Sequence, residues 1–184
     1  MPGHSIHDNI LITHEIMHKF KNLKGKATWV ALKLDIEKTY DRLEWDFIEE
    51  CLYRLGFHEI WIKWIIECIT TVFYSLVIND EPTGHLRPSR GIRQGDPLLP
   101  YIFIMCMEVF STALINAAQK PRTGLGIKLT TGGERIPCLL FAEDYLLFCR
   151  ADQTNCSKLK HLLDEFCIQS GQLINFHKYT LTFS

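Results

Sequence analysis

The 184-residue sequence has little net charge and no segment of biased composition. Its 20 lysines and arginines are balanced by 21 aspartates and glutamates, which leaves a formal charge of −1 with histidine neutral. This balance excludes a general electrostatic attraction to nucleic acid, so any such binding must come from local basic patches. Internal repeats are also missing, and 47% hydrophobic residues suffice for one globular domain with a core of its own.

The sequence lacks the cysteine spacing of a zinc site or a disulfide framework. Its seven cysteines form no CxxC pair and mostly lie in apolar runs, as Cys106 and Cys149 do, which indicates small core residues in a reducing compartment. The longest apolar run, 98–109, contains a proline and a glutamate and is too short to span a membrane. No signal-peptide pattern is present. We therefore expect a soluble intracellular chain, or a piece of one, in the nucleus or cytoplasm and without a membrane partner.

The spacing of the apolar residues predicts an α+β fold. Helices are expected at 7–21, 44–55, 58–70 and about 97–118. The core face of a further helix is expected to carry Cys156, Leu159, Leu163, Phe166 and Cys167. Strands are expected at 28–36, at 72–78, in a hairpin over 136–149 and near 179–183, with a loop marked by proline and glycine between 78 and 84. Together these elements predict an antiparallel sheet with helices packed on one of its faces.

Two adjacent acids, Glu143 and Asp144, interrupt an apolar stretch at the expected tip of the 136–149 hairpin. Carboxylates among apolar residues are costly unless their charge is compensated, and a divalent metal is the usual compensation. Asp35 ends another apolar strand, on the face opposite to that of Leu34. One acid on a strand and two at a hairpin tip form the layout of a two-metal phosphoryl-transfer site. A solvated strand end and an exposed turn are the alternatives.

A glycine-containing basic loop, residues 88–97, precedes a predicted helix. Glycines on both sides of Gln94 let the backbone approach a ligand closely, and the N-terminus of the following helix favours phosphate. Arg90 and Arg93 add positive charge to the same loop. The segment therefore predicts a phosphate-binding loop, with an ordinary basic surface loop as the alternative.

In this order and spacing, the segments resemble the reverse transcriptase core of a non-LTR (LINE-type) retrotransposon, most closely those abundant in plant genomes. The matching stretches are 2–10, 33–45, 88–101, 140–150 and 170–175. The resemblance implies an RNA-directed DNA polymerase whose partners are an RNA template, a DNA primer and deoxynucleoside triphosphates. It implies a single truncated domain, with partial fingers at 1–27 and 58–90 and the palm at 28–57 and 91–184. Thumb, endonuclease and RNase H segments are expected to be absent.

The resemblance assigns the chemistry to a small group of residues. Asp35, Glu143 and Asp144 match the catalytic acids that bind two Mg²⁺ ions, and the main-chain carbonyl of Ile36 is expected to be a further metal ligand. Lys178 resembles the lysine that protonates the leaving pyrophosphate.

Other residues match the nucleotide pocket of the family. Tyr40 corresponds to the steric gate that senses the 2′-hydroxyl of the incoming sugar. The residues that contact the nucleotide and the template correspond to Arg90, Arg93, Gln94 and Gly95.

Glu143 departs from the family pattern, which has two aspartates at the hairpin tip. The extra methylene displaces the carboxylate by up to ~1.5 Å, whereas Mg²⁺ requires octahedral oxygen ligands at about 2.0–2.1 Å. A misplacement of about 1 Å can cost on the order of 10²-fold in rate. We therefore expect polymerase activity to be weak or lost, and a catalytically dead palm remnant that binds RNA or a protein is the main alternative.

A short motif points to a different class of enzyme. Residues 14–18 read HEIMH, and on a helix the two histidines of an HExxH motif bind zinc with the glutamate, here Glu15, as general base. Lys21 and Lys24 stand where an extended zinc-protease motif has glycine and histidine, and only 13 residues precede the motif. A zinc protease is therefore a remote alternative.

Overall fold

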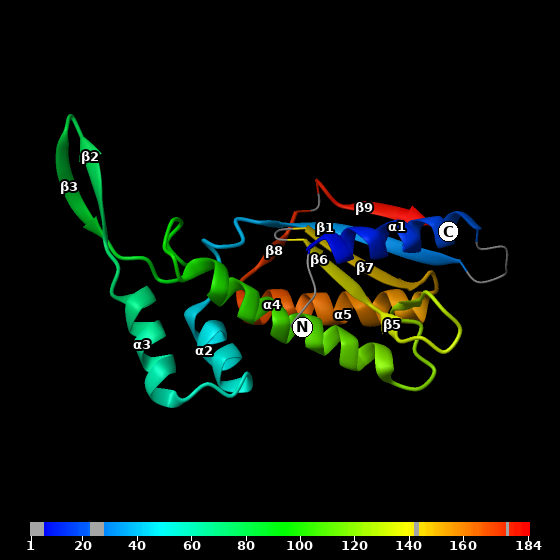
Figure 1. Ribbon diagram of the computed structural model, residues 1–184. Helices are drawn as coiled ribbons and strands as arrows, with labels where there is room; N and C mark the ends of the chain where they lie inside the picture. Colours follow the sequence, from blue (N-terminus) through cyan, green and yellow to red (C-terminus); the bar gives the residue numbers. More distant parts are fainter. Residues whose placement is uncertain (1–5, 23–27, 142–143, 176) are drawn as a thin grey trace. The chain divides into compact units, whose positions relative to one another are not determined.

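The computed structural model describes residues 6–22, 28–141, 144–175 and 177–184. Its architecture is α+β, as predicted (Figure 1). The elements in chain order are α1 (Ile6–Asn22), β1 (Trp29–Glu37), α2 (Trp45–Arg54), α3 (Glu59–Thr70), β2 (Tyr74–Ile78), β3 (Glu81–Leu86), α4 (Leu99–Gln119), β4 (Ile127–Lys128), β5 (Arg135–Ile136), β6 (Cys138–Phe141), β7 (Asp144–Arg150), α5 (Gln153–Ser170), β8 (Leu173–Ile174) and β9 (Thr180–Phe183). Glu143, one of the expected catalytic acids, lies outside the described residues.

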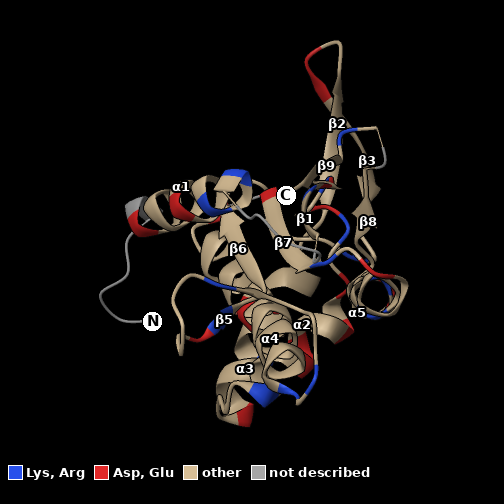
Figure 2. Ribbon diagram, turned by 90° about the vertical axis from the view of Figure 1, so that its right-hand side faces the viewer, with Lys and Arg blue, Asp and Glu red and all other residues tan. Residues whose placement is uncertain are grey.

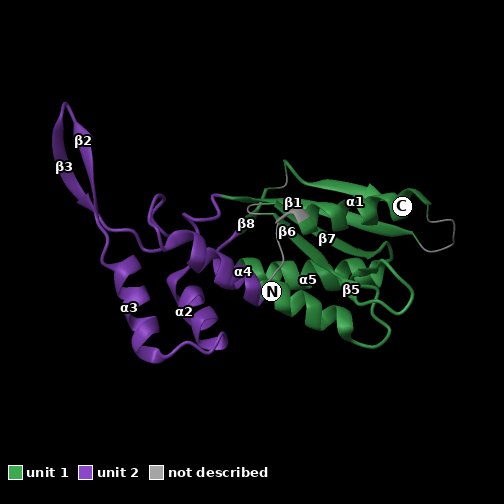
Figure 3. Cartoon of the chain, viewed as in Figure 1, with its two compact units in different colours: residues 1–37, 110–167, 173–184 green, residues 38–109, 168–172 purple. Residues whose placement is uncertain are grey.

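The chain divides into two compact units (Figure 3). Unit 1 comprises residues 1–37, 110–167 and 173–184, and unit 2 comprises residues 38–109 and 168–172. The helices α4 and α5 contribute residues to both units. The assignment of fingers and palm along the chain stays a prediction.

Unit 1 contains an antiparallel sheet with the strand order β6-β7-β1-β8, in which β9 also pairs with β1. Along one edge of β1, the pairing with β7 runs from Trp29 opposite Arg150 to Asp35 opposite Asp144. Along its other edge, β1 pairs with β9 and then with β8. The predicted antiparallel sheet is confirmed, and the predicted acidic hairpin is the pair β6–β7.

One face of this sheet packs against α1. Ala31 of β1 lies in a buried cluster with Ile16 and Phe20 of α1. Phe20 also meets Phe148 of β7 edge to face, with the ring centroids 6.3 Å apart. The apolar stripe of α1 therefore covers the sheet face on which Ala31 lies.

The opposite face of the sheet packs against α4 and α5. Tyr145 of β7 meets Phe110 of α4 edge to face at 6.2 Å between centroids, and Phe110 stacks on Phe166 of α5 at 4.1 Å. The prediction that helices cover only one face is therefore wrong. Val30 and Ala31 point to opposite faces of β1 and both are buried, so each face needs an apolar cover.

Charged residues of α1 help to anchor it to unit 1. The acidic residues of this helix precede its basic residues, which lie in its last turn (Figure 2). The ammonium group of Lys19 donates hydrogen bonds to the carbonyl of Leu129, at 3.0 Å, and to the carbonyl of Lys128. This lysine therefore fixes the helix next to β4.

Unit 2 contains the helix pair α2 and α3, predicted as two helices separated at Gly56. Gly56 has a φ of +82°, which glycine adopts without the steric penalty of other residues. Ile48 and Leu52 of α2 and Ile62 of α3 are completely buried. Their buried faces explain why this region reads as two amphipathic helices.

The strands β2 and β3 form a hairpin in which every side chain is exposed. The expected loop between 78 and 84 is wrong in part, because residues 81–86 form the second strand. Asn79 and Asp80 make the two-residue turn, with φ values of +51° and +66°, the left-handed geometry that suits a tight hairpin. Pro82 is accommodated because a hairpin strand has an edge that needs no backbone donor.

The helix α4 starts two residues later than predicted. The Asp96 carboxylate accepts a hydrogen bond from the backbone N–H of Leu98 at 2.8 Å, so this side chain stabilises a turn ahead of the helix. Among the described residues, α4 alone is long and apolar enough to meet the length and composition of a membrane span. Its buried residues, which include Ile102, Cys106 and Leu114, recur at helical spacing and form one core-facing side of the helix.

Candidate active site

The strands β1 and β7 bring together two acids that are more than a hundred positions apart in the chain. Asp35 and Asp144 are direct partners in the antiparallel register. Directly opposed residues share one face of the sheet, with their Cβ atoms about 4.5–5.5 Å apart. The structure thus places Asp35 beside the acidic hairpin, while the third predicted acid, Glu143, lies outside the described residues.

Each of these two carboxylates contacts a lysine. The Lys33 ammonium lies 2.7 Å from Oδ2 of Asp144, and the Lys178 ammonium lies 3.3 Å from Oδ2 of Asp35. Lys33 precedes Asp35 by two positions on β1, so both side chains are on the same face. Reasoning from the sequence assigned no role to Lys33, although its position two residues before an acid on a strand was the available signal.

A turn between β8 and β9 carries Lys178 to the acids. The backbone N–H of Lys178 donates to the carbonyl of Asn175 at 3.1 Å. The backbone N–H of Asn175 in turn donates to the carbonyl of Asp35 at 2.9 Å. Asn175 is therefore bound to β1 at the level of the acid. The lysine predicted from the resemblance lies next to the predicted acid, and its proton-donating role stays a prediction.

The donor set of this site suits magnesium by chemistry. Mg²⁺ prefers carboxylate oxygens, and Asp35 and Asp144 present partly exposed carboxylates on one face, with side-chain exposures of 27% and 44%. Within the described part of the chain, no group of three or more histidine, cysteine, aspartate or glutamate side chains could hold a metal. That result also applies to the HExxH residues 14–18, so this motif provides no zinc cluster there.

In unit 2, the segment 38–44 and the loop 90–96 are bound to each other. The backbone N–H of Ile92 donates to the carbonyl of Tyr40 at 2.9 Å, and the N–H of Gly91 donates to the carbonyl of Leu43 at 2.8 Å. Gly91 has a φ of +85°, and a Cβ atom there would lie 2.5 Å from the carbonyl oxygen of Asp41. Only glycine fits this close approach.

The residues predicted to contact nucleotide lie in or beside this loop. Tyr40 meets Phe103 edge to face at 5.0 Å between ring centroids. The Arg90 guanidinium bonds to Oε1 of Glu44 at 2.9 Å, and Nε2 of Gln94 lies 3.4 Å from Oδ1 of Asp41.

A cavity of about 260 Å³ opens at this loop in unit 2. Its lining includes Arg90, Arg93, Asp41 and Asp96. Gly95 has a φ of +88° and open space where a Cβ would stand. The structure therefore brings the predicted nucleotide residues together within unit 2, and their binding role stays a prediction.

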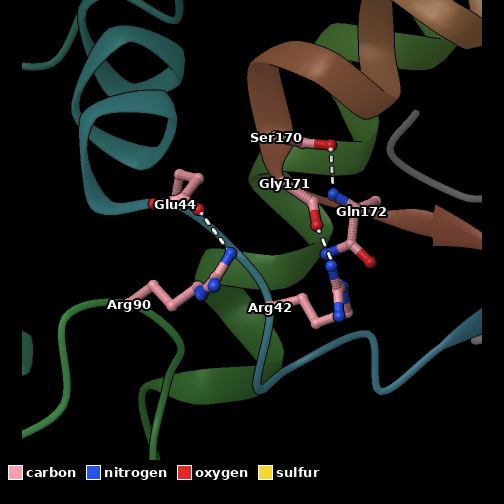
Figure 4. A network of polar contacts seen from close by, with 6 residues as sticks. All are labelled: Arg42, Glu44, Arg90, Ser170, Gly171 and Gln172. Carbon is pink, nitrogen blue, oxygen red and sulfur yellow. Dashed lines mark hydrogen bonds and ion pairs between the residues drawn. The ribbon is translucent and has the colours of Figure 1, made fainter.

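A third segment, residues 170–172, holds the 39–44 segment from the other side (Figure 4). The backbone N–H of Glu44 donates to the carbonyl of Ser170 at 2.9 Å, and Nε of Arg42 donates to the carbonyl of Gly171 at 3.1 Å. The side-chain amide of Gln172, which is only 1% exposed, donates to the carbonyl of Thr39 at 2.7 Å. This Ser-Gly-Gln segment, matched only by resemblance, therefore has a structural task that its sequence did not reveal.

Comparisons with known proteins agree on one family. The family model for reverse transcriptase (RNA-dependent DNA polymerase) matches residues 1–183. The retrovirus-related Pol polyprotein from type-1 retrotransposable element R2 of Popillia japonica is 29% identical over 138 residues, which cover 75% of this chain and 21% of that protein. The transposon TX1 uncharacterized 149 kDa protein of Xenopus laevis is 26% identical, with coverage of 97% and 13%.

A plant relative and two solved structures extend the comparison. An uncharacterized mitochondrial protein of Arabidopsis thaliana is 51% identical over 73 residues, 39% of this chain and 59% of that protein. Apo telomerase of Candida tropicalis, truncated from its C-terminal domain, matches with a TM-score of 0.68 and 15% identity over 98% of this chain and 35% of that one. Telomerase of Candida albicans with a fragment of telomeric RNA also gives 0.68, at 14% identity over 97% and 30%. At such identities the likeness concerns the fold alone.

The match covers only part of each of these curated relatives. It spans between 13% and 59% of the length of the three proteins just described.

Proposed function

Because the chain belongs to the reverse transcriptase family and is related to non-LTR retrotransposon enzymes, we propose that it carries the palm and part of the fingers of an RNA-directed DNA polymerase. Its reaction would extend a DNA primer with deoxynucleoside triphosphates along an RNA template. The observation that carries this proposal is the direct pairing of Asp35 with Asp144 on β1 and β7. Its residence in a reducing intracellular compartment stays a prediction.

The residues around this pair divide the work of nucleotidyl transfer. Asp35, Glu143 and Asp144, with the carbonyl of Ile36, would hold magnesium. Two bound Mg²⁺ ions supply activation of the primer hydroxyl and neutralisation of the triphosphate. Lys178, whose ammonium lies 3.3 Å from Asp35, would donate the proton that the leaving pyrophosphate needs.

The segment 38–44 and the loop 90–96 of unit 2, together called the loop cluster, would select and hold the nucleotide. Arg90 and Arg93 supply positive charge for phosphate groups. Tyr40, fixed against Phe103, would limit the space at the sugar 2′-position, and the backbone around Gly95 leaves room for a template or nucleotide base.

Glu143 is proposed to weaken this activity, because its carboxylate reaches one methylene further than the aspartate of the family pattern. A primer-extension assay on an RNA template, with the parent chain and the Glu143→Asp variant at equal concentration, tests this. We expect Glu143→Asp to raise the rate on the order of 10²-fold. Asp35→Asn in both backgrounds should remove incorporation. Robust synthesis by the parent chain contradicts the proposed impairment, and synthesis that survives Asp35→Asn contradicts the proposed function.

A second candidate function is a catalytically inactive module that binds RNA. The lysine contacts of both Asp35 and Asp144 favour it, because these ion pairs satisfy the acids without metal. This alternative predicts RNA binding that weakens with salt and no nucleotide incorporation by either the parent chain or Glu143→Asp.

A further inference from the structure

The acid pair of unit 1, Asp35 and Asp144, is contacted by two lysine side chains. Asp35 and Asp144 lie directly opposite each other, and like charges in such a pair destabilise a sheet. Lys33 contacts one of the two carboxylates and Lys178 contacts the other. The two lysines therefore reduce a repulsion that the register of β1 and β7 imposes.

We propose that Lys33 is a resident counter-ion of this site, which positions Asp144 while no metal is bound and which a divalent cation must displace. The proposal rests on the proposed function only in taking the two aspartates as the metal ligands. Lys33 is a positioning residue, because it acts through Asp144.

Lys33 suits this task better than Lys178 does. It lies in the middle of β1, opposite Leu146 of β7 on one side and opposite Thr180 of β9 on the other, so its backbone is held along both edges. Its ammonium is also nearer to its partner, at 2.7 Å against 3.3 Å. Lys178 projects from a turn and its side chain is 67% exposed, against 49% for Lys33.

The presence of Lys33 should lower the affinity of the site for a divalent cation. An incoming divalent cation loses affinity to the extent that the lysine already binds its ligand, and it is also repelled by the ammonium charge. Removing that charge should therefore tighten metal binding. Since the pair is about half exposed, a coupling typical of exposed ion pairs corresponds to about a two- to five-fold tighter dissociation constant.

Titration of the full chain with Mn²⁺, followed by electron paramagnetic resonance of the free ion, measures this affinity without polymerase activity. We expect Lys33→Met to bind Mn²⁺ about two- to five-fold more tightly than the parent chain, and Lys33→Arg to resemble the parent. Lys160→Met is the matched control, because Lys160 contacts Asp164 on α5 at 2.6 Å instead of an acid of the site; it should leave the affinity unchanged.

A double-mutant cycle tests the metal-free role of the same residue. With chelator present, the unfolding constants of Lys33→Met, Asp144→Asn and the double variant should show coupling of about two- to five-fold. The cycle of Lys160 with Asp164 gives the coupling of an ordinary exposed helical pair for comparison.

Equal or weaker Mn²⁺ binding by Lys33→Met, binding by neither chain, or no coupling in the cycle overturns the proposal. These results are distinguishable from failure of the proposed function. If the chain incorporates nucleotides but Lys33→Met leaves Mn²⁺ affinity unchanged, only the role of Lys33 falls. If incorporation survives Asp35→Asn, the polymerase assignment falls whatever Mn²⁺ does.

Discussion

The acid pair of unit 1 and the loop cluster of unit 2 are held in place by different means. Asp35 and Asp144 take their positions from a ladder of backbone hydrogen bonds along β1 and β7, which does not depend on the identity of the acids. The loop at Gly91 is held by a few isolated backbone hydrogen bonds, and its close approach to Asp41 requires glycine. The difference indicates that substitution of an acid in the first region should affect chemistry, whereas substitution of Gly91 in the second should affect stability.

The largest effect is expected at the acid pair. In the Glu143→Asp chain, Asp144→Asn should lower primer extension by on the order of 10²–10³-fold, the typical loss when one preorganised electrostatic contact is removed from a reacting centre. Its free energy of unfolding should change by less than about 1 kcal/mol, because the ion pair with Lys33 is partly exposed. Primer extension and urea unfolding measure the two quantities.

Asp164→Asn on α5 is the control for that substitution, since Asp164 pairs with a lysine on the same helix. It should change neither quantity strongly. An Asp144→Asn chain that unfolds several kcal/mol more easily would show that the acid pair, too, is a structural requirement.

A large effect on stability is expected in the loop cluster. Gly91→Ala should lower the free energy of unfolding by about 2–4 kcal/mol, because the new Cβ adds a clash with the Asp41 carbonyl to the strain of a positive φ. Gly95→Ala carries the strain alone, since its Cβ would meet open space, and should cost about 1 kcal/mol. Equal losses measured by urea unfolding would contradict the role given to the close approach.

A pH-dependent change in stability is expected at the start of α5 in unit 1 and not at the Gly91 loop of unit 2. Asp152 accepts hydrogen bonds from the backbone N–H and the side chain of Asn155 at the start of α5, and these bonds lower the pKa of its carboxyl. A carboxyl whose pKa is lower in the folded state than in the unfolded state stabilises the protein at pH values above the unfolded-state pKa. This stabilisation is lost as the pH falls through the folded-state pKa. Asp152→Ala should therefore destabilise at neutral pH and have little effect in strong acid.

The loss of unfolding free energy in Gly91→Ala should not depend on pH, because a steric clash does not titrate. Thermal unfolding of both variants at neutral and strongly acidic pH measures the difference. A constant loss across pH in Asp152→Ala would remove the capping explanation.

The smallest expected effect concerns thiol reactivity. Cys68 in unit 2 and Cys156 in unit 1 are exposed, whereas Cys51, Cys106 and Cys149 are buried. Burial, with the nearby Cys156 and Asp152, raises the pKa of Cys149 to about 12, so its reactive thiolate is scarce at neutral pH. Iodoacetamide followed by peptide mass spectrometry should label Cys68 and Cys156 first, and early labelling of Cys149 would indicate that unit 1 opens locally.

Several features were predictable from the sequence because they depend on neighbours along the chain. The helices α2 and α3 follow from apolar spacing around Gly56, and the β6–β7 hairpin follows from two apolar runs with acids between them. The Cys156 position was misjudged: the spacing placed it on the core face of α5, but it is exposed. Apolar spacing identifies the side of the helix on which a residue lies, but it does not determine how far the packing extends along that side.

The residue pattern by itself determined the α+β class, most element positions and the resemblance to reverse transcriptases, since periodicity and motif order are local properties of the chain. Only the tertiary structure decided that Asp35 stands opposite Asp144, that Lys33 binds the second of these acids, that both sheet faces carry helices and that Gly91 touches Asp41. Strand register, ion pairing and close backbone contacts join residues that are distant in sequence, and they form only where the packed chain brings those residues to the same place.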